Sequence, residues 1–335
     1  MSETYIPRND DDLAVPANRL VDSNQMVPNT TIQQAQDRAR NPALAYLMSL
    51  RSAQSRVTMK SYLSILAKKL GYDRLEDCPW QDLTRQHVMA LVEALQMDGL
   101  APNTINTYLA GVKGVALEAR SLRLMDTDNF LDIKAVKRVR GYRLPKGRAL
   151  ERHEIDRLIA ACRADSGSKA IRDEAMLKVL LGCGLRRDEV VRIDYPDHVD
   201  WRNDSLRIRG KGNKERRAYM PKGTVKALRR WVMEVRGEQP GPLFTRIRRH
   251  DTLTLAKLSN QAVYFVLAER CLAAGIEEVA PHDLRRTFAT TMMDAGVDIL
   301  TLQRMMGHAS VETTKQYDKR GDDAMRQATD QFAMF

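Results

Sequence analysis

Apolar residues recur at helical spacing over residues 41–133, and residues that start or stop helices separate the stretches. The first clear stretch ends at Gly71, the second is capped by Thr84 and ends at Gly99, and Pro102 opens the third. Leucine, isoleucine and valine fall on one face of each stretch. The pattern predicts a small helical bundle over residues 41–133.

A mixed pattern begins at residue 149 and continues to residue 320. Helical spacing covers 155–162 and 170–183, and Gly184 then interrupts it. Three short strand-like runs follow, HVDWR, LRIRG and ERRAYM, with turn residues between them. We therefore expect a mainly α fold with a small antiparallel β-sheet. Its later helices are expected near 222–236, 259–274, 282–295, 298–306 and 310–318.

Three segments flank or join these two domains. Residues 1–40 are polar and lack an apolar period, which favours a mobile N-terminal segment. Residues 134–148 hold seven Lys or Arg and no acid, so we expect a basic interdomain linker that is either solvated or follows a DNA backbone. Residues 321–335 predict a C-terminal helix, which packs on its own chain or is exchanged between protomers. Its apolar face consists of Met325, Ala328, Phe332 and Phe335.

The charge balance changes this picture by pointing to a polyanionic partner. Lys and Arg total 54 against 43 Asp and Glu, which gives a net charge of +11 and favours nucleic acid over an anionic membrane. No stretch approaches the roughly 18 to 20 apolar residues of a membrane span, and the polar start does not resemble a signal peptide. We expect a cytoplasmic protein, associated with the nucleoid if its partner is DNA.

The residues that commonly hold cofactors are scattered along the sequence. The four cysteines lie far apart, so we expect them to be reduced and buried. No cluster of carboxylates or close His and Cys pair indicates a metal site, and no glycine-lysine phosphate loop indicates ATP binding. We therefore expect no metal and no cofactor, and any phosphate chemistry must depend on cationic side chains.

Two motifs place arginine beside a group that could orient it. In GCGLRRDEV, Glu189 lies one turn from Arg186 and could fix its guanidinium for a phosphate; the ordinary alternative is an exposed ion pair. In PHDLRRTF, His282 and Arg285 share a face at a helix N-terminus, where unpaired N–H groups favour an oxyanion; the alternative is a helix with surface arginines.

Two further motifs supply a lysine, a histidine and a tyrosine. RIRGKGNKERR places Lys211 at a hairpin tip, where it could protonate a leaving alkoxide or simply be solvated. LQRMMGHASVETTKQYDKR places His308 just after a helix and Tyr317 near the end of the next. A tyrosine or histidine at such positions is usually structural when it stands alone.

Taken together, the motifs resemble those of the tyrosine recombinases, the phage integrase family. GLRRDEV resembles the first arginine box of the family, GKGNKER its strand-turn lysine, HDLRRTFAT its His-x-x-Arg box, and MGHAS with the later tyrosine its closing box. The resemblance covers 150–335 by motif and extends more loosely over 41–140, which resembles the helical core-binding domain. It identifies six catalytic residues, namely Arg186, Lys211, His282, Arg285, His308 and Tyr317.

The resemblance implies an enzyme that cuts and rejoins DNA through a 3'-phosphotyrosine on Tyr317, without metal or ATP. It also implies a two-domain clamp around double-stranded DNA that carries recombination sites, and a homotetramer on paired sites, with accessory DNA-bending or regulatory proteins as further partners. The cations would stabilise the charge on the phosphate, and Glu189 would support Arg186.

Two departures and three alternatives accompany this resemblance. Arg286 stands where many members have a second histidine, and residues 1–40 lack the strands of an arm-binding domain, which favours a simpler recombinase that resolves chromosome dimers or transposons. A type IB topoisomerase would use similar residues. A catalytically inactive DNA-binding regulator would keep the fold, and a metal nuclease would need acidic ligands that are missing.

Overall fold

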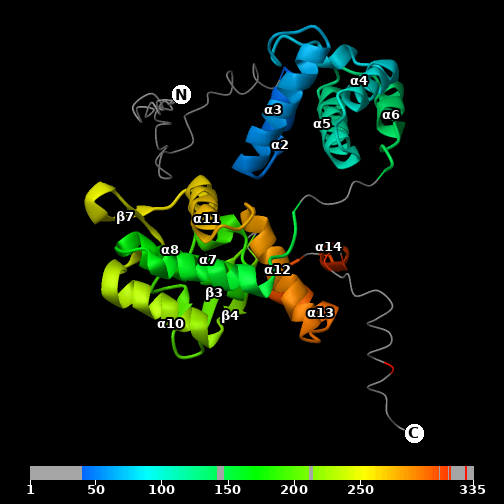
Figure 1. The fold of residues 1–335 in the computed structure, drawn as a ribbon. Helices are drawn as coiled ribbons and strands as arrows, with labels where there is room; N and C mark the ends of the chain where they lie inside the picture. Colours follow the sequence, from blue (N-terminus) through cyan, green and yellow to red (C-terminus); the bar gives the residue numbers. More distant parts are fainter. Residues whose placement is uncertain are drawn as a thin grey trace, which may run out of the picture. The chain divides into compact units, whose positions relative to one another are not determined.

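A computed structural model describes residues 40–141, 147–210, 214–308, 310–315, 317 and 329 of the chain. These residues form two compact units, and the division between them falls between Leu144 and Pro145, inside the segment predicted as a linker (Figure 1). The mainly α fold with small antiparallel sheets is confirmed. The predictions for residues 1–39 and for the C-terminal helix fall on residues that are not described, apart from Thr329.

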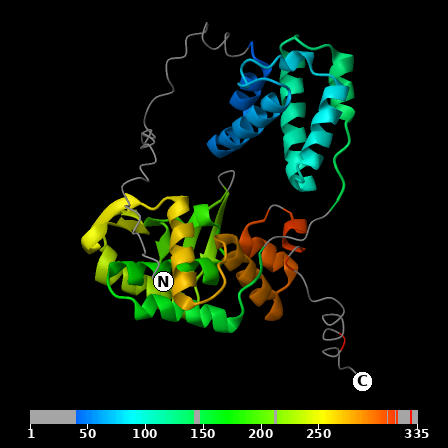
Figure 2. The same cartoon turned by 45° about the horizontal axis from the view of Figure 1, so that its top comes forward.

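The first unit is an all-helical bundle built around one central helix. This helix is α5 (Pro102–Ser121), which packs against α2 (Pro42–Ser49), α3 (Ala53–Lys69), α4 (Arg85–Met97) and α6 (Thr127–Ala135) (Figures 1 and 2). The caps predicted from the sequence are present, with Thr84 before α4 and Pro102 at the start of α5. The 3₁₀ turn Trp80–Asp82 buries Trp80, which donates its indole N–H to Leu75 at 2.7 Å.

The chain that leaves α6 remains attached to the first unit for several residues. Asn106 exchanges two hydrogen bonds with the backbone of Val139, at 2.9 and 3.0 Å. Lys113 donates to the carbonyls of Lys134 and Val136, and the side chain of Val136 is buried in the helical core. The first residues of the predicted linker are therefore bound to the helical unit, which the charge of the segment alone does not predict.

The second unit surrounds the buried helix α8 (Ser168–Cys183). It packs against α7 (Arg152–Ala164), α10 (Lys222–Trp231) and α12 (Pro281–Asp294). The chain of α10 continues as a π-helical turn, Val232–Arg236. The remaining helices are α9 (Arg187–Val190), α11 (Asn260–Ala274), α13 (Ile299–Met306) and α14 (Glu312–Lys315).

Three small antiparallel sheets complete the second unit. The predicted sheet is confirmed as β2 (Val199–Asp200), β3 (Ser205–Arg209) and β4 (Glu215–Tyr219), with Leu206 opposite Ala218. Two further sheets were not predicted. They pair β1 (Asp194–Tyr195) with β5 (Gly241–Pro242), and β6 (Thr245–Ile247) with β7 (Leu253–Lys257).

The buried face of α12 consists of Leu284, Phe288 and Met293, whereas Ala295, which follows the last residue of the helix, is exposed. All four cysteines are unpaired and buried as expected, and burial raises the thiol pKa values, that of Cys162 to about 12. No helix in the described ranges is long and apolar enough to cross a membrane.

Candidate active site

Five of the six candidate catalytic residues lie close together in the second unit, near the ends of four helices. Arg186 is the N-cap of α9, and His282 and Arg285 lie in the first turns of α12. His308 follows α13 after the left-handed residue Gly307, and Tyr317 follows α14. Helix ends leave backbone groups unpaired, so each of these positions can present a side chain and polar backbone atoms to the same space.

Gly184 fixes the geometry at the end of α8. Its φ of 58° lies in the left-handed region, and a Cβ at this position would overlap the ring of Phe288 on α12. Its carbonyl accepts a hydrogen bond from Arg285 Nη1 at 2.6 Å. The glycine therefore turns the chain toward Arg186 and holds α8 against the second candidate arginine.

Arg285 is a buried cation that backbone carbonyls hold in place. Its side chain is 1% exposed, and Nη2 donates to the carbonyl of Met306 at 2.6 Å. Its Nε has no hydrogen-bond partner among the described residues, which leaves a buried donor for an incoming acceptor. Burial, with the nearby charge of Arg186, lowers the pKa of Arg285 to about 10, so the side chain still carries its charge at neutral pH.

His308 is neutral and held at both ring nitrogens. Nε2 lies 2.7 Å from Arg285 Nη2, and because an arginine only donates, Nε2 must accept. Nδ1 therefore carries the proton and donates to Thr314 Oγ1 at 2.8 Å. Burial and the cations Arg285 and Arg186 lower the pKa of His308 to about 4.

Tyr317 lies beside both histidines. Its hydroxyl is 3.1 Å from His282 Nε2, and its ring stacks on that of His308 with the centroids 6.2 Å apart. Partial burial of the His282 ring, helped by the charges of Arg285 and Arg286, lowers the pKa of His282. His282 is therefore neutral at pH 7, and its Nε2 can accept the phenolic proton. The contact places a proton acceptor within hydrogen-bond distance of the phenol.

Glu189 links the two candidate arginines. Its carboxylate is 1% exposed and accepts from Arg186 Nη1 at 2.9 Å and from the backbone N–H of Arg186 at 2.8 Å, as the sequence predicted. Arg216 of β4 also binds both carboxylate oxygens at 2.9 Å, and Arg285 Nη1 lies 3.8 Å away. Burial alone would raise the pKa of Glu189, but the hydrogen bonds and charges of Arg216 and Arg186 lower it to about 2.

Arg216 is the residue at this site that sequence reasoning missed, and Lys211 is the one the structure does not place. Lys211 lies outside the described residues, although Gly210 donates to the Lys214 carbonyl at 2.8 Å and closes the predicted hairpin. The missed signal was alternation along β4. Arg216 shares the inward face with the buried Ala218, where an arginine requires a partner.

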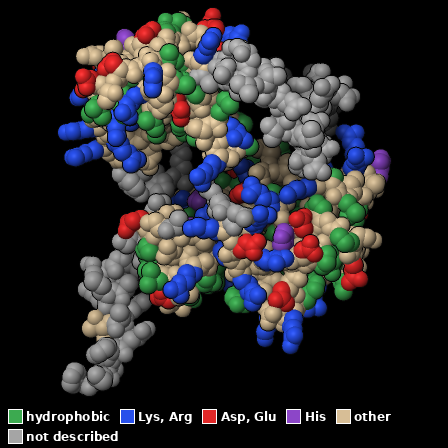
Figure 3. Space-filling model, turned by 180° about the vertical axis from the view of Figure 1, so that it is seen from behind, with side chains coloured by type: hydrophobic (Ala, Val, Ile, Leu, Met, Phe, Trp, Pro, Cys, Tyr) green, Lys and Arg blue, Asp and Glu red, His purple; other side chains and the backbone are tan. Residues whose placement is uncertain are grey.

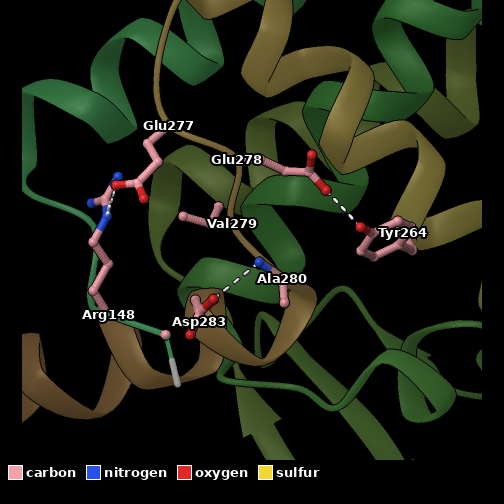
Figure 4. A pocket seen from close by; sticks show the side chains of 8 residues that line it. Arg148, Tyr264, Glu277, Glu278, Val279, Ala280 and Asp283 are labelled. Carbon is pink, nitrogen blue, oxygen red and sulfur yellow. Dashed lines mark hydrogen bonds and ion pairs between the residues drawn. The ribbon is translucent and has the colours of Figure 1, made fainter. Parts of the chain in front are cut away.

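A pocket of about 490 Å³ lies beside the start of α12 and contains none of the six candidate residues (Figure 4). On its walls Tyr264 donates to Glu278 at 2.6 Å, and Arg148 Nε contacts Glu277 at 3.1 Å. Asp283 accepts from the backbone N–H of Ala280 and so caps α12. These contacts fix the segment that leads into α12. In the described part of the chain, this pocket included, no three His, Cys, Asp or Glu side chains gather as metal ligands would.

Comparison with known proteins identifies the family whose motifs this sequence resembles. The sequence profile of the phage integrase family matches residues 148–323, just over half of the chain. Tyrosine recombinase XerC of Alcanivorax borkumensis is 31% identical over 244 residues, which cover 71% of this chain and 76% of that protein. Tyrosine recombinase XerD of Oceanobacillus iheyensis is 27% identical over 267 residues, which cover 78% and 86% of the two chains.

Solved structures show the same fold at lower identity. The Tn1549 transposon integrase in complex with a circular intermediate DNA has a TM-score of 0.65 and 17% identity, with 88% of this chain and 99% of that chain covered. A lambda integrase dimer bound to a core site has a TM-score of 0.63 and 16% identity, with 85% and 96% covered. This chain belongs to the phage integrase family, the tyrosine recombinases.

Proposed function

We propose that this site-specific DNA recombinase cuts each strand by attack of Tyr317 Oη on a backbone phosphorus. The bond from phosphorus to the 5' oxygen breaks, and a 3'-phosphotyrosine forms. Because this ester conserves the energy of the broken bond, a 5' hydroxyl from another strand can displace the tyrosine without ATP. The observation that carries the proposal is the 3.1 Å contact between Tyr317 Oη and His282 Nε2 beside the cations.

The cationic groups act on the phosphate. Negative charge grows on its non-bridging oxygens in the transition state, and preorganised donors in a site of low dielectric stabilise that charge strongly. Arg285 offers the unpartnered Nε, and Arg186 is held by Glu189 while remaining 37% exposed. Nε2 of His308 accepts a hydrogen bond from Arg285. To donate to a phosphate oxygen, Nε2 must release this contact and carry a proton.

Two groups move protons. His282 is neutral at pH 7 and takes the proton of Tyr317, or orients the hydroxyl, as the tyrosine attacks. Lys211 protonates the departing 5' oxygen; this role rests on the resemblance of GKGNKER to the lysine hairpin of the family. The same hairpin begins at Gly210, where an added Cβ would lie 3.7 Å from Glu189 Oε1, so the strand that leads to the lysine ends beside the arginines.

Double-stranded DNA is the partner, and charge supports the binding. The chain carries +11, and Figure 3 shows Lys and Arg side chains gathered on both units with Asp and Glu scattered between them. In the proposal the helical unit and the catalytic unit form a clamp on the duplex. The relatives described above are named recombinases and integrases, which favours recombination over relaxation by a type IB topoisomerase.

Assembly follows from the chemistry of exchange. Two duplexes offer four strands to be cut, and each protomer supplies a single Tyr317, so exchange between paired sites requires a homotetramer. Residues 321–335 would link neighbouring protomers in it. Accessory DNA-bending proteins and association with the nucleoid belong to the same proposal.

The test is a covalent adduct on nicked DNA that contains the recombination site. A nick beside the cleavage point makes the fragment with the freed 5' hydroxyl short enough to diffuse away. Without that hydroxyl the phosphotyrosine cannot be resealed, so the adduct accumulates. We expect an adduct with the wild-type protein, with and without a chelator, and with Tyr219→Phe, which changes an exposed tyrosine on β4. Tyr317→Phe should give none. An adduct that persists in Tyr317→Phe would assign the nucleophile to another residue.

A further inference from the structure

Arg216 of β4 lies at the junction of the candidate site. Its side chain is 12% exposed, and each of its three guanidinium nitrogens already donates a hydrogen bond. Nη1 and Nη2 bind the two oxygens of Glu189 at 2.9 Å, and Nε donates to the carbonyl of Met305 at 3.0 Å. A bidentate carboxylate contact of this kind fixes the position and the plane of both groups.

The second contact ties Arg216 to the turn that carries His308. Met305 belongs to the last turn of α13, and the neighbouring Met306 carbonyl accepts from Arg285. Gly307 has a φ of 63°, and a Cβ there would lie 3.1 to 3.3 Å from the Cδ, Nη1 and Nε atoms of Arg216. The chain after α13 therefore packs directly on this guanidinium before it reaches His308.

The first contact ties Arg216 to both candidate arginines. Glu189 orients Arg186 through its side chain and its backbone N–H, and it lies 3.8 Å from Arg285 Nη1. Without Arg216, each oxygen of Glu189 would lose one of its two hydrogen-bond donors, and Arg186 alone would hold the carboxylate. A displacement of about 1 Å in a catalytic group can cost about 100-fold in rate.

We propose that Arg216 is a positioning residue for strand cleavage. It holds Glu189 against Arg186 and fixes the C-terminal end of α13 before His308, so that β4, α9 and α13 set the positions of the phosphate-binding groups together. The proposal rests on the proposed function. The inference adds that the rate of cleavage depends on Arg216 although its three guanidinium nitrogens bind protein groups, and that the affinity for DNA does not depend on it.

The experiment compares Arg216→Lys with Arg217→Lys. Arg217 is the next residue of the same strand and is exposed, so the pair makes the same change on opposite faces of β4. A single ammonium cannot serve two carboxylate oxygens and a carbonyl at once. At saturating nicked DNA we expect cleavage to slow by about 100-fold in Arg216→Lys and to stay unchanged in Arg217→Lys. The Kd for DNA should change less than about threefold in both.

A double variant separates positioning from general damage. If Arg216 acts through Glu189, the variant Glu189→Gln/Arg216→Gln should cleave no more slowly than the slower of its two single variants. If the loss of rate in the double variant equals the product of the two single losses, the proposal is overturned. It is also overturned if Arg216→Lys cleaves at the wild-type rate. All variants are compared at a temperature at which each is folded, so that loss of the fold is not counted as loss of positioning.

The outcomes also separate this inference from the proposed function. Absence of an adduct with the wild-type protein, or an adduct in Tyr317→Phe, would refute the proposed function. Normal Tyr317-dependent cleavage by Arg216→Lys would refute only the role of Arg216.

Discussion

Glu189→Gln should destabilise the catalytic unit as well as slow cleavage. The glutamine has nearly the same shape, but it removes the one negative charge among Arg186, Arg216 and Arg285. One of its terminal atoms also becomes a donor that faces other donors. The site then holds three cations with no buried carboxylate to offset them, and the free energy of unfolding falls.

The size of this loss follows both from the pKa of Glu189 and from the behaviour of buried ion pairs. The pKa falls from 4.5 to about 2 on folding, and each pKa unit corresponds to about 1.4 kcal/mol, which gives about 3 kcal/mol at neutral pH. Removal of one partner from a buried ion pair typically costs about 3 to 5 kcal/mol. In a domain of this size, a loss of about 3 kcal/mol lowers the Tm by about 6 to 12 °C.

The pH dependence has a definite sign. Because the folded pKa lies below the unfolded one, the stabilising effect of Glu189 is complete above pH 4.5 and is lost as the pH falls toward 2. The difference in Tm between wild type and Glu189→Gln should therefore be constant from about pH 7 to about pH 5 and shrink below pH 4.5.

The assay is calorimetric unfolding of both proteins across this pH range, with Asp188→Asn as the control. Asp188 lies next to Glu189 on α9 but forms only an exposed pair with Arg192 at 3.4 Å, so its loss should cost less than about 1 kcal/mol. Equal Tm values for Glu189→Gln and Asp188→Asn would refute the view that the carboxylate holds the arginines together.

Two further predictions concern the backbone at the site and the base. Gly184→Ala should destabilise the catalytic unit by about 1 kcal/mol or more in chemical denaturation, because the alanine must adopt a φ of 58° against the Phe288 ring; Gly223→Ala in α10, where a Cβ meets nothing within 4 Å, should be neutral or stabilising. An equal effect at the two glycines would contradict this account. The cleavage rate should fall on acidification with a midpoint below pH 6.5, because protonated His282 cannot accept the proton of Tyr317; a midpoint above pH 6.5 in the pH–rate profile would exclude this role.

The sequence predicted those parts of the site that depend on local rules. The helix expected near 282–295 begins at Pro281, and Gly184 ends α8 as expected. Glu189, predicted one turn from Arg186, binds its guanidinium. They depend on the helical period and on glycine geometry, which neighbouring residues encode. The motifs of the site come from distant segments, which no local rule connects. Their joint resemblance to one family predicted that they form a single site.

The residue missed at the site depends on contacts between distant segments. Arg216 resembles its basic neighbours in the sequence, and only the fold shows that it meets Glu189 and Met305. Strand alternation gave a hint, because Ala218 is buried on the same face. The hint alone could not name its partners.

The hairpin of β6 and β7 was missed for a different reason. Its turn contains no Gly or Pro and is made by His250 and Asp251 with φ values of 57° and 55°. The carboxylate of Asp251 accepts from the backbone N–H of Ser168, at 3.0 and 3.1 Å, and from its hydroxyl at 2.8 Å. A contact across 83 positions therefore supports a backbone conformation that the local sequence does not favour.

The central claim is that cations from distant segments and one tyrosine meet at a single phosphate. The most direct measurement is a structure of the Tyr317→Phe protein assembled on its intact DNA site. We expect Arg186, Arg285 and His308 to contact the oxygens of one backbone phosphate, with the ring of residue 317 beside its phosphorus and opposite the 5' oxygen. Contacts spread over different phosphates, or a ring at position 317 that is buried away from DNA in every protomer, would contradict the account.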